Sequence, residues 1–217
     1  MIKLSTVARQ LHHHIRLNHS FRCDLEWWHV FLEKWNGVSL LWDSVQPAAV
    51  MTSDASGRWG CGAFWGTQWF QVKWPESVLH LHITVKELIP IVIAAAVWGH
   101  AWQKTHIRMR SDNSAVVAII NSGYSRDAEV MHLMRCLHFL AAHHNCRISA
   151  EHIRGVLNEA ADALSRDSLS TFQALQPAAS KTPTPIPSQL LDILIGNKPD
   201  WLSTNWTHLF NAICHSQ

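Results

Sequence analysis

The sequence has no Cys-x-x-C pair, and its cysteines are few and scattered: Cys23, Cys61, Cys136, Cys146 and Cys214. Their odd number and irregular spacing argue against a disulfide framework and against a zinc finger. Free thiols of this kind are typical of a reducing compartment. We therefore expect an intracellular protein, in the cytoplasm or the nucleus.

Long hydrophobic runs and a strong charge of one sign are also missing. The apolar run at 88–98 has about half of the ~20 residues that cross a bilayer. Residues 1–15 are polar and rich in histidine, unlike a signal peptide. We therefore expect no membrane partner. The formal net charge is only +2, so a surface that binds an acidic partner must be local.

The apolar fraction is large, 47% of 217 residues, which is ample for a core and favours one domain with appendages. Strand and helix signals alternate between residues 48 and 167. We expect strands at 48–54, 60–66, 68–74, 106–112 and 146–153. We expect helices at 85–102, 113–121, 127–144 and 158–166. The order βββαβααβα predicts an α/β fold, a mixed five-stranded sheet with helices on its faces.

The segment 1–46 is predicted to be helical and to precede the core domain. Asp24 is a candidate helix cap. The aromatic residues that follow it recur at helical spacing and form a broad apolar stripe: Trp27, Trp28, Phe31 and Trp35. A free stripe of this size is an aggregation hazard, so we expect it to fold back onto the core domain, away from the acidic residues described next.

The C-terminal part is predicted to be peripheral. Residues 169–188 are rich in proline and are typical of a linker. Residues 189–217 contain two short amphipathic pieces, around 190–195 and 206–213. We expect both pieces to be loosely held, because the linker separates them from the core domain, which spans 47–168.

Four acids carry the functional information: Asp54, Glu87, Asp112 and Asp162. Each lies where an expected strand ends or within an expected helix near its start. Hard cations such as Mg²⁺ take oxygen ligands. Two such ions held ~3.5–4 Å apart can cleave a phosphodiester. A single acid in a sequence is usually a solvated surface carboxylate, so the order and context of the four decide the matter.

The context of these acids resembles a known family. The motifs are Asp-Ala-Ser-x-x-x-Gly-x-Gly-Ala at 54–63, Thr-Val-Lys-Glu-Leu at 84–88, Ser-Asp-Asn-Ser at 111–114, and Asn-Glu-Ala-Ala-Asp-Ala-Leu-Ser-Arg within 152–166. In this order they resemble the ribonuclease H fold family. More narrowly, they are similar to the ribonuclease H domain of reverse transcriptases in retroelements, especially the DIRS-like group that carries a tyrosine recombinase.

The resemblance implies a ribonuclease H-like fold for 47–168, with 1–46 as a connection segment and 189–217 as a spacer. It implies an endonuclease that cuts the RNA strand of RNA–DNA hybrids, with the polymerase domain of a parent reverse transcriptase as partner. By the family mechanism, the catalytic and metal-binding residues hold two Mg²⁺ ions, with Mn²⁺ as an alternative: Asp54, Glu87, Asp112 and Asp162.

Further residues are candidates for contact with the substrate. Ser56 and Asn113 are placed to bond the nucleic-acid backbone, and they are equally well placed to act as a turn residue and a helix cap. Asn158 matches the Asn-Glu pair of the last motif and is expected to organise the start of a helix. Arg154 is expected to contact a phosphate.

The tryptophans near the second and third strands also allow two interpretations. They are suited to stacking on bases or sugars, and equally to packing in the core, which is the more frequent role of tryptophan. The residues concerned are Trp59, Trp65, Trp69 and Trp74.

The chain departs from the family at one position. Many members carry a histidine before the Asn-Glu pair, where this chain has Val156 and Leu157 after Gly155. His152 lies near, with a strand phase that the sequence leaves open. This departure keeps a non-catalytic domain, decayed or co-opted from a retrotransposon, as an alternative. A transposase or integrase is a third interpretation, which the Asn-Glu-x-x-Asp helix favours less.

The sequence shows no sign of the other enzymes of such elements. The lone tyrosine, Tyr124, is not part of a polymerase Tyr-x-Asp-Asp signature. The catalytic tyrosine and Arg-His set of a recombinase are not recognisable either.

Overall fold

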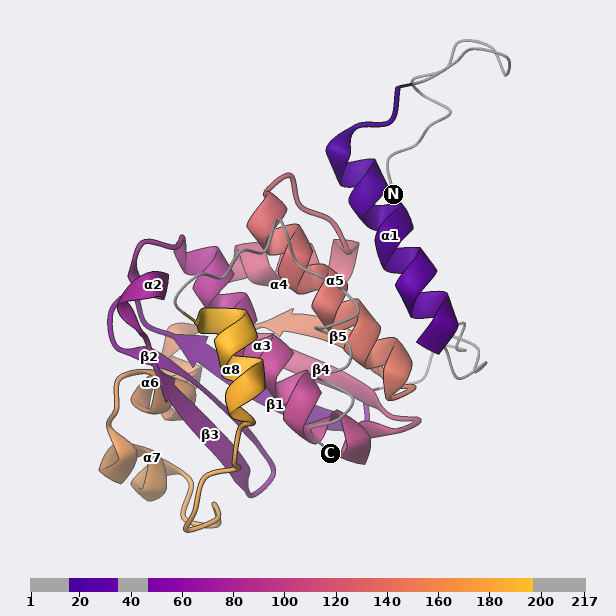
Figure 1. Ribbon diagram of the computed structural model, residues 1–217. Helices are drawn as coiled ribbons and strands as arrows, with labels where there is room; N and C mark the ends of the chain where they lie inside the picture. The colour runs from indigo at the N-terminus through magenta and orange to yellow at the C-terminus, as the bar shows by residue number, and fades with distance from the viewer. Residues whose placement is uncertain (1–15, 35–46, 197–217) are drawn as a thin grey trace.

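A mixed five-stranded sheet forms the centre of the protein (Figure 1). The structure is a computed structural model that describes residues 16–34 and 47–196. The strands lie in the order β3-β2-β1-β4-β5, and β1, β4 and β5 are parallel while β2 is antiparallel to both of its neighbours. Their bounds are Ala49–Ala55, Gly60–Trp65, Gln68–Lys73, His106–Ser111 and Arg147–His152 for β1 to β5. All five predicted strands are present, with ends shifted by one residue at most.

The alternation of side chains along the strands explains why helices cover both faces. On β2 and β3, the pair Ala63 and Phe70 points into a large core, while the next pair, Phe64 and Trp69, belongs to a second, smaller core. The sheet therefore separates two apolar layers. This mixed five-stranded sheet with helices on its faces is the α/β architecture that the sequence predicts.

The large core lies between the sheet and helices α3 and α5. The main helices follow the predicted pattern: α3 (Ile83–Trp98), the short 3-10 helix η2 (Gly99–Trp102), α4 (Ser114–Ser122), α5 (Ala128–His143) and α6 (Glu159–Ser165). By length and composition, Ile83–Trp102 could cross a membrane, but 78% of its apolar stretch is buried inside the protein. It serves here as the central helix of the core.

The small core lies beneath α6 and α7 (Leu169–Leu175) and includes Leu164 and the fully buried Phe172. Gly62 of β2 allows α6 to approach the sheet, because a Cβ at this position would clash with the Cβ of Leu164. The small core therefore depends on a glycine of the first motif, at 54–63.

The segment 169–188 differs from the linker that its composition predicts. It begins with α7 and then runs along the free edge of β3. The Ser180 N–H donates to the Thr67 carbonyl and the Thr184 N–H to the Trp69 carbonyl, both at 2.7 Å. Pro183 between these donors, and Pro185 after them, have no N–H of their own, so the segment covers the edge without extending the sheet. The proline-rich composition predicted a linker because the sequence alone does not show that β3 has an open edge for this segment to cover.

Helix α8 (Ser188–Ile195) also differs from the expectation of a loosely held piece. Leu190, Leu194 and Ile195 are buried in the large core, on the α3 side of the sheet (Figure 1). The Ile195 carbonyl accepts a hydrogen bond from the Ser77 hydroxyl, beside the short helix α2 (Glu76–Leu79). The second predicted piece, 206–213, lies outside the described residues.

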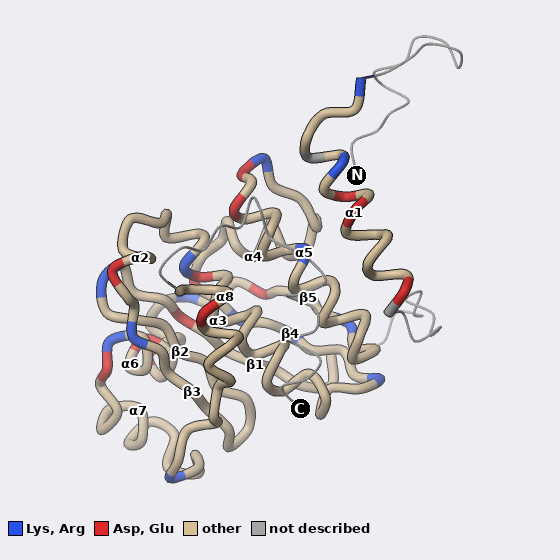
Figure 2. Tube along the Cα trace, viewed as in Figure 1, with Lys and Arg blue, Asp and Glu red and all other residues tan. Residues whose placement is uncertain are grey.

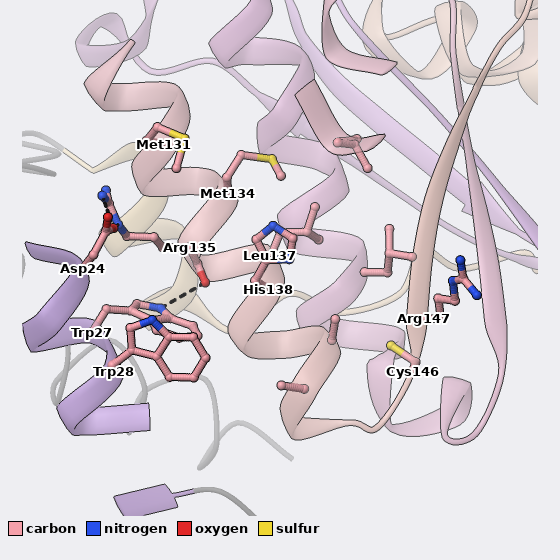
Figure 3. Close-up of a pocket in the computed structure, with 14 residues that line it drawn as sticks. Asp24, Trp27, Trp28, Met131, Met134, Arg135, Leu137, His138, Cys146 and Arg147 are labelled. Carbon is pink, nitrogen blue, oxygen red and sulfur yellow. Dashed lines mark hydrogen bonds and ion pairs between the residues drawn. The ribbon is translucent and has the colours of Figure 1, made fainter. Parts of the chain in front are cut away.

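Helix α1 (His19–Lys34) packs against α5, as the apolar stripe predicts. Trp27 and Phe31 are buried, and the Trp27 indole donates to the Arg135 carbonyl at 3.2 Å (Figure 3). Asp24 is not the predicted cap. The helix begins earlier, where Asn18 accepts from the Phe21 N–H, and Asp24 pairs instead with the Arg135 guanidinium.

The packing of α1 leaves part of the stripe uncovered. Trp28 is 44% exposed and borders a cavity of about 630 Å³ between α1, α4, α5 and β5 (Figure 3). Trp35, the last residue of the predicted stripe, lies outside the described residues.

The buried position of α8 generates a test. Leu194→Ala should lower the free energy of unfolding by about 2–5 kcal/mol, because it removes a fully buried side chain from the large core. It should also speed tryptic cleavage after the exposed Lys181, since α8 anchors the segment on the β3 edge. Asp192→Ala, on the exposed side of the same helix, is the matched control. Equal stability of the Leu194 variant and wild type would show that α8 is loosely held.

Candidate metal centre

Three acids from distant parts of the chain meet at one edge of the sheet. The parallel strands β1, β4 and β5 all end at this edge. Asp54 lies near the end of β1, Asp112 directly follows β4, and Glu87 comes from the start of α3, which packs on β1. One carboxylate oxygen of each lies within 4.8 Å of the others, the only such group among the described residues. Figure 2 shows acidic positions gathered near the start of α3.

Two of the three carboxylates are withdrawn from solvent. Asp54 is 5% exposed and Glu87 is 4% exposed, while Asp112 is more accessible. The Glu87 Oε2 atom is buried and has no hydrogen-bond partner among the described residues. A buried carboxylate oxygen without a partner is costly. An oxygen-ligated cation such as Mg²⁺ would supply the missing partner, so the donor set fits a hard divalent ion.

The electrostatics of the site favour protonation in the absence of metal. The pKa of Glu87 is raised to about 9, first by burial and then by the charges of Asp54 and Asp112, while a hydrogen bond from the Ala55 backbone opposes the rise. The pKa of Asp54 is raised to about 6, mainly by burial and also by the charges of Asp112 and Asp162, while a hydrogen bond from Ser165 opposes the rise. A bound cation would reverse the balance in both groups.

The side chain of Asn158 orients the Asp54 carboxylate by a hydrogen bond. Its side chain is 1% exposed, and its Nδ2 donates to Asp54 Oδ1 at 3.1 Å and to the Ser53 carbonyl at 3.3 Å. It was expected to organise the start of α6, but its side chain caps no N–H there. The amide instead fixes the orientation of a carboxylate, which the motif spacing did not reveal.

Asp162 lies close to the three acids but outside their group. Its Oδ1 accepts from Arg166 Nε at 2.6 Å, one turn further along α6. Its charge nevertheless raises the pKa of Asp54. Three of the four predicted acids therefore converge, and the fourth stands at the rim. Their role as metal ligands stays a prediction.

The other predicted contact residues occupy structural positions. Ser56 is buried, and its hydroxyl accepts from the Trp59 and Gly60 N–H groups, both at 2.9 Å, within the β1–β2 turn. Asn113 caps α4 through its Oδ1. The turn and cap interpretations thus account for both. Arg154 is exposed directly before the 3-10 helix η3 (Gly155–Leu157) and remains a candidate for phosphate contact.

The sequence analysis did not identify the roles of two residues beside the site, Lys86 and His152. Lys86 is only 3% exposed, and its ammonium donates to the Gly57 carbonyl at 2.7 Å and the Leu79 carbonyl at 2.9 Å, which ties the β1–β2 turn to α2 and α3. Burial lowers its pKa. Its place beside Glu87, at the start of an apolar stretch, was the feature of the sequence that could have indicated a buried lysine. His152 is exposed, and its Nε2 contacts the Asp112 backbone carbonyl at 3.0 Å, not a carboxylate.

The position where the family carries histidine is apolar and open. Val156 and Leu157 on η3 are 71% and 72% exposed. A Cβ on the preceding Gly155 would lie 3.4 Å from Asp112 Oδ2, so η3 directly adjoins the site.

The raised pKa values generate a prediction for the metal-free protein. A folded-state pKa above the usual 4.5 means that folded Glu87 keeps a proton that the unfolded chain has released, so its contribution to stability falls as pH rises towards about 9. The Glu87→Gln variant lacks this loss. With EDTA present, its melting temperature should exceed that of wild type by a margin that widens with pH. A difference in melting temperature that narrows with pH or changes sign would contradict the raised pKa of Glu87.

Comparisons with known proteins add little to this geometry. No family model matches the chain, and no curated protein matches it. Among solved structures, it is similar to the crystal structure of RNase H1 from the halophilic archaeon Halobacterium salinarum NRC-1. The sequence identity is 16% and the TM-score 0.40, over 56% of this chain and 96% of that one. Similarity at this level supports no argument about function, which therefore rests on the carboxylates.

Proposed function

We propose that the protein is a metal-dependent nuclease that cuts the RNA strand of RNA–DNA hybrids. The observation that carries the proposal is the convergence of Asp54, Glu87 and Asp112, two of them buried, at the carboxyl edge of the sheet. The fold would hold this crowded negative charge at a cost in stability. Such a cost is common at functional sites, where strongly shifted pKa values cluster.

The residues divide the work as follows. Asp54, Glu87 and Asp112 would hold Mg²⁺, with Mn²⁺ as an alternative. A metal held there would supply activation of a water molecule and stabilisation of the departing oxygen of the cleaved phosphodiester. Asn158 keeps Asp54 oriented through its amide. The apolar core beneath Glu87 limits the access of bulk water, which strengthens electrostatic interactions at the site.

The choice of hybrid as substrate and of a retroelement as origin rests on the four sequence motifs. A hybrid would be recognised by backbone shape and by 2′-hydroxyl groups. The motifs also support a parent reverse transcriptase whose polymerase domain is the natural partner. A chain of this kind would act inside the cell, in the cytoplasm or the nucleus.

A non-catalytic hybrid-binding domain is the second candidate. The observation that favours it is the apolar pair Val156 and Leu157, which stands where the family carries histidine. Asp112, which lies near the preceding Gly155, would still bind metal. The two candidates differ in turnover, not in binding.

A cleavage assay separates the candidates. A hybrid labelled on the RNA strand is incubated with the full chain and Mg²⁺, and a hybrid labelled on the DNA strand and a DNA duplex serve as controls. The nuclease proposal expects shortening of the RNA strand only, abolished by EDTA. Binding of the hybrid without any cleavage, in Mg²⁺ or Mn²⁺, would instead establish the non-catalytic alternative.

The geometry predicts which acids matter most for cleavage. Asp54→Asn and Asp112→Asn should each reduce cleavage by about 100-fold or more, because loss of a metal's outer partner alone commonly costs ~10–100-fold. Asp162→Asn should cost less, since its carboxylate lies outside the converging group. Glu159→Gln on the same helix removes the same charge at an exposed position and is the matched control.

These variants should stay folded, because each relieves repulsion or leaves it unchanged. Circular dichroism and thermal melts check this in the absence of metal. An Asp112→Asn variant that is folded and cleaves the hybrid at the wild-type rate would refute the assignment of the site.

A further inference from the structure

The structure separates the four tryptophans that the sequence left open. Trp69 is 2% exposed and Trp74 is 8% exposed, and Trp65 packs partly buried against the large core. These three residues fill the fold. Trp59 does not, because 66% of it is exposed to solvent. Core packing therefore explains three of the four, and the fourth needs another explanation.

Trp59 stands on a turn that is held rigidly. Its N–H donates to the Ser56 hydroxyl at 2.9 Å, and its carbonyl accepts from the Trp74 N–H at 2.9 Å. The same turn is anchored by Lys86, whose ammonium donates to the Gly57 carbonyl. An indole has only two side-chain torsions, so an exposed ring on a fixed backbone gives contact area at a low entropic cost.

The turn lies at the same edge of the sheet as the carboxylates. It directly follows β1, the strand that carries Asp54. The Ser56 hydroxyl also contacts the Ser165 carbonyl of α6 at 3.1 Å, and Ser165 in turn lowers the pKa of Asp54. Arg58, next to Trp59 on the turn, is exposed. An exposed aromatic ring and an exposed guanidinium thus adjoin the acidic site.

We propose that Trp59 is a substrate-contact residue whose indole packs on a sugar or base of the nucleic-acid strand that reaches the carboxylates, with Arg58 at a neighbouring phosphate. The inference rests on the proposed function, because it takes the substrate to be nucleic acid. Such a contact is tolerant of sequence, since every base has a π-face and every nucleotide carries a sugar. This suits a site that reads the shape of a hybrid and not its base sequence.

The test measures binding separately from cleavage. The full chain carrying Asp54→Asn is titrated into a fluorescein-labelled RNA–DNA hybrid, and fluorescence anisotropy gives the Kd. Adding Trp59→Ala should raise the Kd by about 5-fold to 100-fold, the range for loss of one stacked base. Trp59→Phe should keep most of the affinity because the ring remains. Trp28→Ala, at an exposed tryptophan on α1, is the matched control and should leave the Kd unchanged.

Salt dependence distinguishes stacking from charge. Trp59→Ala should shift the plot of log K against log salt without changing its slope, whereas Arg58→Gln should reduce the slope by about one. Thermal melts should show that the Trp59 and Arg58 variants are folded, since both of these side chains are exposed.

The outcomes separate the two proposals. An unchanged Kd for Trp59→Ala, or an equal loss for Trp28→Ala, overturns the inference and leaves the nuclease proposal standing. Tight binding by the Asp54→Asn chain together with no cleavage by wild type overturns the nuclease proposal alone. If the Asp54→Asn chain does not bind the hybrid, the inference is overturned, and if wild type also fails to cleave the hybrid, both proposals are overturned.

Discussion

Repulsion among closely spaced carboxylates is the constraint around which this protein is organised. Asp54, Glu87 and Asp112 meet within 4.8 Å although the chain separates them widely. Burial makes the ionised forms of Glu87 and Asp54 costly, with a pKa of about 9 for Glu87 and about 6 for Asp54. A fold that holds such groups together must draw its stability from other interactions. Groups with such shifted pKa values cluster at functional sites.

The stability comes from the sheet and its two apolar layers. α3 carries Glu87, and most of its residues are buried, so the carboxylate stands on a helix that the large core packs around. The free edges of the sheet are covered as well. The segment 180–184 bonds the edge of β3, and Asn121 of α4 bonds both the N–H and the carbonyl of Ala150 on β5. Covered edges suppress pairing with other chains.

The local parts of this structure were predictable from the sequence. Alternating apolar residues fixed the strands to within one residue, and the position of each acid at a strand end placed Asp54 and Asp112 at the same edge. Parallel strands make that inference safe, since their carboxyl ends share an edge. The apolar stripe on α1 also predicted its packing on the domain, which Trp27 and Phe31 confirm.

Features that depend on a distant surface were not predictable. Composition made 169–188 a linker, because nothing local reveals that β3 offers an edge to cover. Asn158 looked like a helix organiser, and only the fold brings its amide to Asp54. Trp59 and Trp69 were equivalent in the sequence, yet one is exposed and the other buried, because Trp59 lies on the turn before β2 whereas Trp69 lies in β3 and packs against α6 and α7.

The central claim is that the three carboxylates form one metal centre. Anomalous scattering from a crystal of the protein soaked in Mn²⁺ tests it most directly, because the peaks locate the ions independently of any activity. The account predicts at least one Mn²⁺ peak ligated jointly by Asp54, Glu87 and Asp112, and its loss in the Asp112→Asn protein. Carboxylates that stand apart in the crystal, or that remain without a peak while Mn²⁺ binds elsewhere, would contradict it.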